Sequence, residues 1–180
     1  MHTIVQAHDL TFRLIIDAAQ IATRVQEMGV QITRDFAGKN PLFVVILKGA
    51  YIFAADLLRA CPIDQEVSFV QLSSYEGISS SKKVVERIPL HVDIKDRVVI
   101  IIEDIIDTGR TLAKFTAQLE SMAPNELKIA TFLHKPDAQE FSLEPDYVGF
   151  TIPNDFVIGY GLDYKEAGRH LAGIYQKIED

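Results

Sequence analysis

The sequence has a single cysteine, Cys61, among its 180 residues, so no disulfide can form within the chain. Low cysteine usage is typical of proteins from reducing compartments. The chain also lacks any uncharged apolar run approaching the roughly 18 residues of a membrane-spanning helix. Its first residues, MHTIVQAHDL, lack the basic and apolar segments of a secretory signal peptide. These absences predict a cytoplasmic protein with no membrane partner.

Positive charge is also scarce, since 18 basic and 25 acidic side chains give a net charge of -7. Proteins that bind nucleic acids usually present a basic face, so we expect no nucleic-acid partner. A length of 180 residues suits one domain, residues 1–180, because single domains most often hold about 100–200 residues. A chain of this size buries about 70% of its unfolded surface and needs no covalent cross-links.

Several ligand-binding motifs are absent as well. The chain has no G-x-x-x-x-G-K-[ST] phosphate loop, and GYGLDY lacks the third glycine of a dinucleotide-binding fingerprint. One cysteine and scattered histidines do not form a zinc site. We expect His134 and His170 to be structural or solvated.

The spacing of apolar residues predicts alternating helices and strands. Residues 11–28 have helical spacing, with Thr11 as N-cap and Gly29 as the stop. The apolar run Leu42–Leu47 predicts a buried strand. Further elements are expected as helices at 51–60 and 110–122, strands at 67–75, 97–103, 127–135, 146–150 and 155–164, and a polar, mobile loop at 76–86. This order predicts an α/β fold with a mainly parallel sheet between helices, and ligands beyond the carboxyl ends of the strands.

The segment VVIIIEDIIDTGRTL, residues 98–112, runs from a buried strand into carboxylates. Burying adjacent carboxylates without partners is costly, so we expect Glu103 and Asp104 at the exposed end of the strand. There they could accept hydrogen bonds from sugar hydroxyls or hold a hard cation such as Mg²⁺. Adjacent strand residues point to opposite sides, so the two side chains are not expected to grip one ion together.

The turn that follows, DTGRT, opens the next predicted helix. The first turn of a helix presents unpaired N–H groups and the positive end of the helix dipole. Gly109 would let an anion approach this backbone, and Thr108 and Thr111 add hydroxyl donors. The pattern indicates a phosphate site. The alternative is that Asp107 or Thr108 only caps the helix, which explains one residue but not the whole stretch.

These residues resemble the phosphoribosyl-pyrophosphate motif of the type I phosphoribosyltransferases. The resemblance covers nearly the whole chain and is narrowed to the branch that acts on 6-oxopurines by LKGAYIFAADL, SSYEG, LHKPD and PNDFVIGYGLDYKEAGRHL. It implies a twisted, mainly parallel sheet flanked by helices. It also implies a lid loop at about 74–86, and a small hood from the N-terminal residues and about 150–180.

The resemblance implies an enzyme that transfers 5-phosphoribosyl from phosphoribosyl pyrophosphate to hypoxanthine, guanine or both. The products would be IMP or GMP and pyrophosphate, with Mg²⁺ as cofactor and a homodimer or homotetramer as the assembly. Two alternatives stay open. One is a nucleotide-sensing regulator on the same fold, because fold does not fix function. The other is a related enzyme that prefers xanthine.

The resemblance also implies roles for residues around the purine and the ribose phosphate. Asp107 would be the general base or acid near N7 of the purine, and Lys135 would donate to its O6. Phe156 would stack on the base, and the backbone of Val157 would contact its edge. Glu103 and Asp104 would engage the ribose hydroxyls, directly or through water and Mg²⁺. The 5′-phosphate would be held by Asp107, Thr108, Gly109, Arg110 and Thr111.

A third group of residues is implied around pyrophosphate. Lys48 and Gly49 would form its binding turn, which often contains a non-proline cis peptide in this family. Asp163 would be a Mg²⁺ ligand, together with Glu103 and Asp104, and Arg169 would contact pyrophosphate. Ser74 and Tyr75 would begin the lid, where Glu76 and Gly77 depart from the small polar residue of many relatives. Without the resemblance, Phe156 would be assigned to the core, and Asp163 and Arg169 to a turn and the surface.

Overall fold

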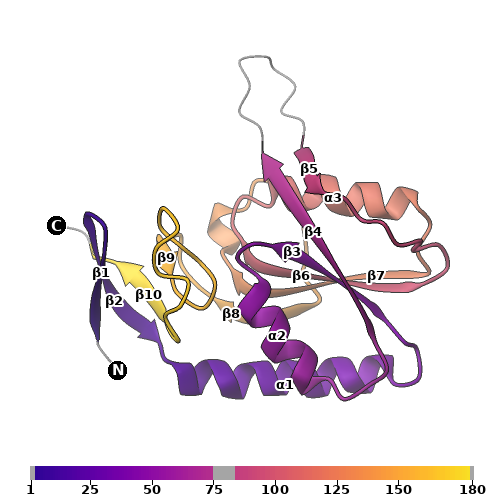
Figure 1. Cartoon of the computed structure of the whole chain (residues 1–180), viewed down its shortest axis with the longest axis horizontal. Helices are drawn as coiled ribbons and strands as arrows, with labels where there is room; N and C mark the ends of the chain where they lie inside the picture. The colour runs from indigo at the N-terminus through magenta and orange to yellow at the C-terminus, as the bar shows by residue number, and fades with distance from the viewer. Residues whose placement is uncertain (1–2, 75–83, 179–180) are drawn as a thin grey trace, which may run out of the picture.

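The computed structural model describes residues 3–74 and 84–178 (Figure 1). Most of the expected lid, including Tyr75, lies outside these residues. A six-stranded sheet has the order β5-β4-β3-β6-β7-β8, in which only β5 runs antiparallel to its neighbour. Its strands are β3 (Leu42–Leu47), β4 (Glu66–Ser74), β5 (Val84–Ile88), β6 (Val98–Ile106), β7 (Glu126–His134) and β8 (Tyr147–Thr151).

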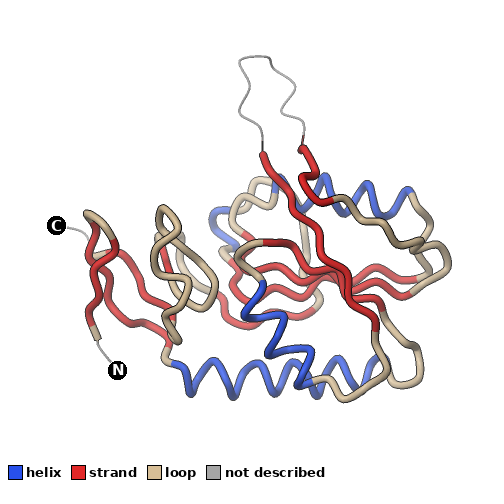
Figure 2. The backbone as a smooth tube through the Cα atoms, in the orientation of Figure 1, coloured by secondary structure: helices blue, strands red, loops and turns tan. Residues whose placement is uncertain are grey.

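Helices cover both faces of this sheet (Figure 2). On one face, α1 (Ala18–Phe36) and α2 (Tyr51–Ala60) pack on apolar side chains of the central strands. On the other face, α3 (Arg110–Ser121) packs through Leu112, Phe115 and Leu119. The predicted α/β fold is therefore confirmed. None of the helices in residues 3–74 and 84–178 combines the length and apolarity needed to cross a membrane.

The helix predicted over residues 11–28 is present from residue 18, but both of its predicted bounds were wrong. Residues Leu10–Ile16 form strand β2, and α1 begins only after Asp17 and continues to Phe36. The side chain of Asp17 accepts hydrogen bonds from the N–H groups of Ala19 and Gln20, which completes a capping box. Gly29 does not end the helix but lies inside α1. A Cβ atom at this position would lie only 2.5 Å from Ala60 of α2. This glycine lets α1 and α2 approach closely.

A second, antiparallel sheet is built from both ends of the described chain. It has the order β1-β2-β10-β9 and lies beside the main sheet, near the two termini (Figure 1). Its strands are β1 (Ile4–Ala7), β2 (Leu10–Ile16), β9 (Val157–Ile158) and β10 (Ile174–Lys177). The strand expected at 155–164 is thus reduced to two residues, and most of residues 159–173 form turns that face the main sheet.

Candidate active site

The end of β3 is packed between β6 and the loop after β9. A Cβ atom on Gly49 would lie 1.4 Å from Asp104 Oδ2, and a Cβ atom on Gly161 would lie 2.0 Å from the carbonyl oxygen of Gly49. Gly161 also has a φ of 105°, which favours glycine. The turn contains a non-proline cis peptide bond, and this bond joins Leu47 to Lys48. The sequence therefore brings three distant segments together at the carboxyl edge of the sheet.

The turn before α3 is open for an anion. The N-cap of α3 is Gly109, with a φ of 75°, and no side chain of the described residues caps it. The capping alternative is thus wrong, and Thr108 accepts only a long hydrogen bond of 3.4 Å from the Arg110 N–H. The guanidinium of Arg110 turns away to Glu140, 2.5 Å away. The turn lines a cavity of about 150 Å³ together with Glu103, Ile105 and Leu112.

Glu103 and Asp104 point to opposite sides of β6, which extends three residues beyond the predicted end of the strand. Glu103 lines the cavity of the turn, whereas Asp104 faces Gly49. Burial, followed by the charge of Asp104, raises the pKa of Glu103 well above its ordinary value. Burial raises the pKa of Asp104 to about 6, although the Ile105 N–H donates to it at 2.9 Å. The Oε2 atom of Glu103 is buried without a hydrogen-bond partner among the described residues.

A second cavity, of about 240 Å³, lies on the other side of Asp107. Lys135 is buried in its wall, and its Nζ lies 3.5 Å from Asp107 Oδ2. Phe156 is 44% exposed and packs against Phe12 and Tyr164, with ring centroids 6.1 and 5.7 Å apart. The remaining lining residues are Asp104, Ile105, Val157, Leu162 and Asp163. Ile105 and Asp107 line both cavities, so the two cavities are adjacent.

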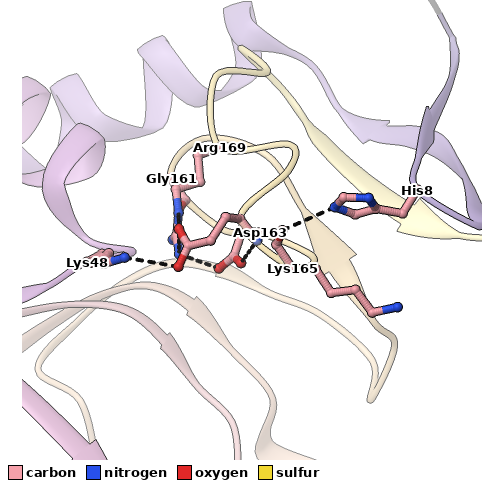
Figure 3. Close-up of polar contacts among 7 residues, drawn as sticks. His8, Lys48, Gly161, Asp163, Lys165 and Arg169 are labelled. Atoms are coloured by element: carbon pink, nitrogen blue, oxygen red, sulfur yellow. Dashed lines mark hydrogen bonds and ion pairs between the residues drawn. The ribbon is translucent and has the colours of Figure 1, made fainter.

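The loop after β9 adds a network of charges (Figure 3). Arg169 Nη2 lies 2.7 Å from Asp163 Oδ1, and Arg169 Nη1 donates to the carbonyl oxygen of Gly161 at 2.8 Å. Glu166 contacts both Arg169, at 3.1 Å, and Lys48, at 3.0 Å. The sequence analysis missed Glu166, for which the only signal was a carboxylate three positions before Arg169.

The structure gathers the predicted site residues around these cavities, except for Tyr75, which lies outside the described residues, and Ser74, which ends β4. The three expected metal ligands do not converge. No cluster of three His, Cys, Asp or Glu side chains suited to a metal occurs in residues 3–74 and 84–178. Asp104 and Asp163 line one cavity and Glu103 lines the other. Mg²⁺ often takes only one or two protein carboxylates and completes its shell with water and substrate phosphates, so Asp104 and Asp163 fit it.

Comparisons with known proteins show the family of the chain. The model of the phosphoribosyl transferase domain matches residues 15–165, so the chain belongs to the phosphoribosyltransferase family. Within that family, it is 42% identical over 160 residues to the hypoxanthine-guanine phosphoribosyltransferase of Streptococcus pneumoniae, covering 88% of this chain and 89% of the relative. It is 43% identical over 168 residues to the enzyme of that name from Mycobacterium tuberculosis, covering 89% of this chain and 83% of the relative.

Solved structures show the same relationship. A hypoxanthine-guanine phosphoribosyltransferase from Bacillus anthracis aligns with a TM-score of 0.85 and 36% identity, covering 92% of this chain and 96% of the other. A hypoxanthine phosphoribosyltransferase from Staphylococcus aureus aligns with a TM-score of 0.88 and 38% identity, covering 92% of this chain and 91% of the other. The similarity therefore extends over most of the chain.

Proposed function

We propose that this protein is a purine salvage enzyme that transfers the phosphoribosyl group of phosphoribosyl pyrophosphate to hypoxanthine, guanine or both. The observation that carries the proposal is the adjacent pair of cavities. One offers the uncapped helix N-terminus, which suits a phosphate, and the other holds a buried lysine beside Asp107. Asp107 lies between them, where a bond from base to ribose would form.

The roles of the side chains follow from their chemistry. Lys135 has donors and no acceptor, so its ammonium suits an oxo group on the purine. The exposed ring of Phe156 offers a stacking face, and the backbone of Val157 lies beside it. Asp107 exchanges the proton at N7 of the base. Lys48, Gly49 and Arg169 receive the pyrophosphate, whose negative charge grows as it leaves and is stabilised by fixed cations.

A direct assay tests this function. Phosphoribosyl pyrophosphate and Mg²⁺ are supplied with hypoxanthine, guanine, xanthine or adenine in turn, and nucleotide formation is followed by absorbance. We expect turnover with hypoxanthine or guanine and little with adenine, whose 6-amino group would meet the ammonium of Lys135 donor to donor. Xanthine keeps the 6-oxo group, so its rate shows how strictly the 2-position is read. No turnover with either hypoxanthine or guanine would remove the proposal.

Mg²⁺ belongs to the same proposal. Asp104 and Asp163 would hold it beside the pyrophosphate, and the ion would neutralise charge on the leaving group. The chain supplies hard oxygen ligands there, and burial raises the pKa of Asp104 to about 6 because it takes the negative charge of the carboxylate out of water. A cation would stabilise this charge.

The cytoplasmic location expected from the sequence stays a prediction.

We also propose that the protein self-associates as a homodimer or homotetramer. Val67 and Phe69 on β4 pair with Phe43 and Val45 on β3, so their side chains lie on the face that carries α1 and α2. They remain 41% and 48% exposed, because α2 covers only the neighbouring strands. Ile88 on β5 pairs with Gln71 on β4, so its side chain lies on the same face, and it is 41% exposed. Contiguous exposed apolar side chains mark association surfaces, and a second copy of the chain is the partner that we assign to this one.

Measurement of the native mass tests the assembly. We expect a multiple of the 20.2 kDa chain mass by sedimentation or light scattering. Val67→Asp should shift the protein to monomer, because a carboxylate would be buried without a partner in the interface. The control is Val30→Asp, which changes a valine on α1 that is 60% exposed and should leave the mass unaltered. A wild-type monomer, or a Val67→Asp variant of unchanged mass, would contradict the surface.

A further inference from the structure

One carboxylate of the chain itself engages both cations that the proposed function assigns to pyrophosphate. Glu166 Oε1 lies 3.0 Å from Lys48 Nζ, and Glu166 Oε2 accepts from Arg169 Nε at 3.2 Å and from Nη2 at 3.1 Å. Figure 3 shows that Lys48 and Arg169 come from different segments of the chain. The two residues come from β3's end and from the loop after β9, so the carboxylate bridges the two sides of the pyrophosphate site.

The backbone holds Glu166 in this place, while its side chain stays at the surface. The Glu166 N–H donates to Asp163 Oδ2 at 2.7 Å, within a tight turn closed by mutual hydrogen bonds between Tyr164 and Ala167. The side chain of Glu166 is 65% exposed. Hydrogen bonds from Lys48 and Arg169 hold the pKa of Glu166 below its ordinary value, so the group is ionised at neutral pH.

The contacts of Glu166 are not needed to position Arg169. This guanidinium is already fixed by the carbonyl oxygen of Gly161 at 2.8 Å and by Asp163 Oδ1 at 2.7 Å. Lys48, by contrast, has Glu166 as its only side-chain partner among the described residues, and it is 55% exposed. A carboxylate in this position has the charge and the acceptor atoms of a phosphate oxygen pair, and it competes for the same donors.

We propose that Glu166 is an internal stand-in for pyrophosphate: it occupies Lys48 and Arg169 in the free protein and is displaced when pyrophosphate or the pyrophosphate end of the sugar substrate binds. The inference rests on the proposed function. Its consequence is that the site binds pyrophosphate less tightly than its cations allow, and that Glu166 re-forms its ion pairs as the product leaves. Exposed ion pairs are individually weak, so the expected effect on affinity is about three- to tenfold.

Calorimetric titration with magnesium pyrophosphate tests the inference. Glu166→Gln keeps the size of the side chain and removes its charge, so it should bind pyrophosphate about three to ten times more tightly than the wild type. Inhibition of the forward reaction by pyrophosphate should strengthen by the same factor. The control is Glu27→Gln, which removes an exposed carboxylate that is also paired with an arginine three residues away, Arg24. It should leave both quantities unchanged.

A second ligand separates competition from a general disturbance of the site. IMP carries no group that reaches Lys48 or Arg169, so Glu166→Gln should bind it with wild-type affinity. Glu166→Ala provides a second variant and should change pyrophosphate affinity in the same direction. Unchanged or weaker binding of pyrophosphate by both variants would overturn the inference alone. A wild-type protein that binds no pyrophosphate and turns over no purine would remove the proposed function, and the inference with it.

Discussion

Replacement of Asp107 by asparagine is expected to lower the turnover number by about two to four orders of magnitude, the range for loss of a general acid–base group. Asparagine has nearly the size of aspartate but cannot take up or release the proton at N7 of the base. The side chain of Asp107 is half exposed and lies between the two cavities, with Lys135 Nζ 3.5 Å from its Oδ2 atom. In the proposed reaction it would therefore face the bond that forms, with the ammonium of Lys135 beside it.

Steady-state kinetics distinguish this role from one in binding. A residue that acts only in the transition state lowers the turnover number without raising the KM, so the KM for phosphoribosyl pyrophosphate should change little in Asp107→Asn. In the proposed function, the backbone of the phosphate turn would supply most of the contacts to the sugar phosphate. The matched control is Asp64→Asn, which alters an exposed aspartate in the loop before β4, at the opposite edge of the sheet. An unchanged turnover number, or a raised KM alone, would contradict the acid–base role.

The site could be predicted from the sequence to the extent that it depends on strand ends. Parallel strands end at one edge of a sheet, so Lys48 after β3, Asp104 near the end of β6 and Lys135 after β7 had to lie near one another. The phosphate turn could also be predicted from the sequence, because Gly109 and its neighbours begin a helix directly after a buried strand. These features need only local patterns and one rule of topology.

The remaining features depend on contacts between distant segments. Glu166 is exposed and polar, and nothing in its neighbourhood indicates Lys48, which is 118 positions away in the sequence. The wrong start of the helix predicted at 11–28 has a similar cause. Leu10–Ile16 forms a strand because it pairs with β1 on one side and with the C-terminal β10 on the other. These pairings override the helical spacing of the apolar residues before Asp17, and the helix begins only after that residue.

Removal of divalent metal is expected to lower turnover by about three orders of magnitude, since a metal ion contributes several kcal/mol to stabilising charge in a transition state. The side chains of the protein cannot fully neutralise the negative charge of the leaving pyrophosphate. Arg169 is partly neutralised by its ion pair with Asp163, at 2.7 Å, and Lys48 is exposed to solvent at the rim of the site. Asp104 adds a negative charge next to the place where pyrophosphate must bind, so the protein alone would repel the leaving group that it has to stabilise.

Titration of a chelator against the standard assay, followed by addition of excess Mg²⁺, measures this dependence. Activity should be lost and then recovered in full, which separates metal removal from denaturation. Asp163→Asn should raise the Mg²⁺ concentration needed for half-maximal activity, whereas Asp64→Asn should not. Turnover that persists in excess chelator would show that Lys48 and Arg169 neutralise pyrophosphate by themselves. In that case Asp163 would serve only to orient Arg169, through the ion pair that the free protein already contains.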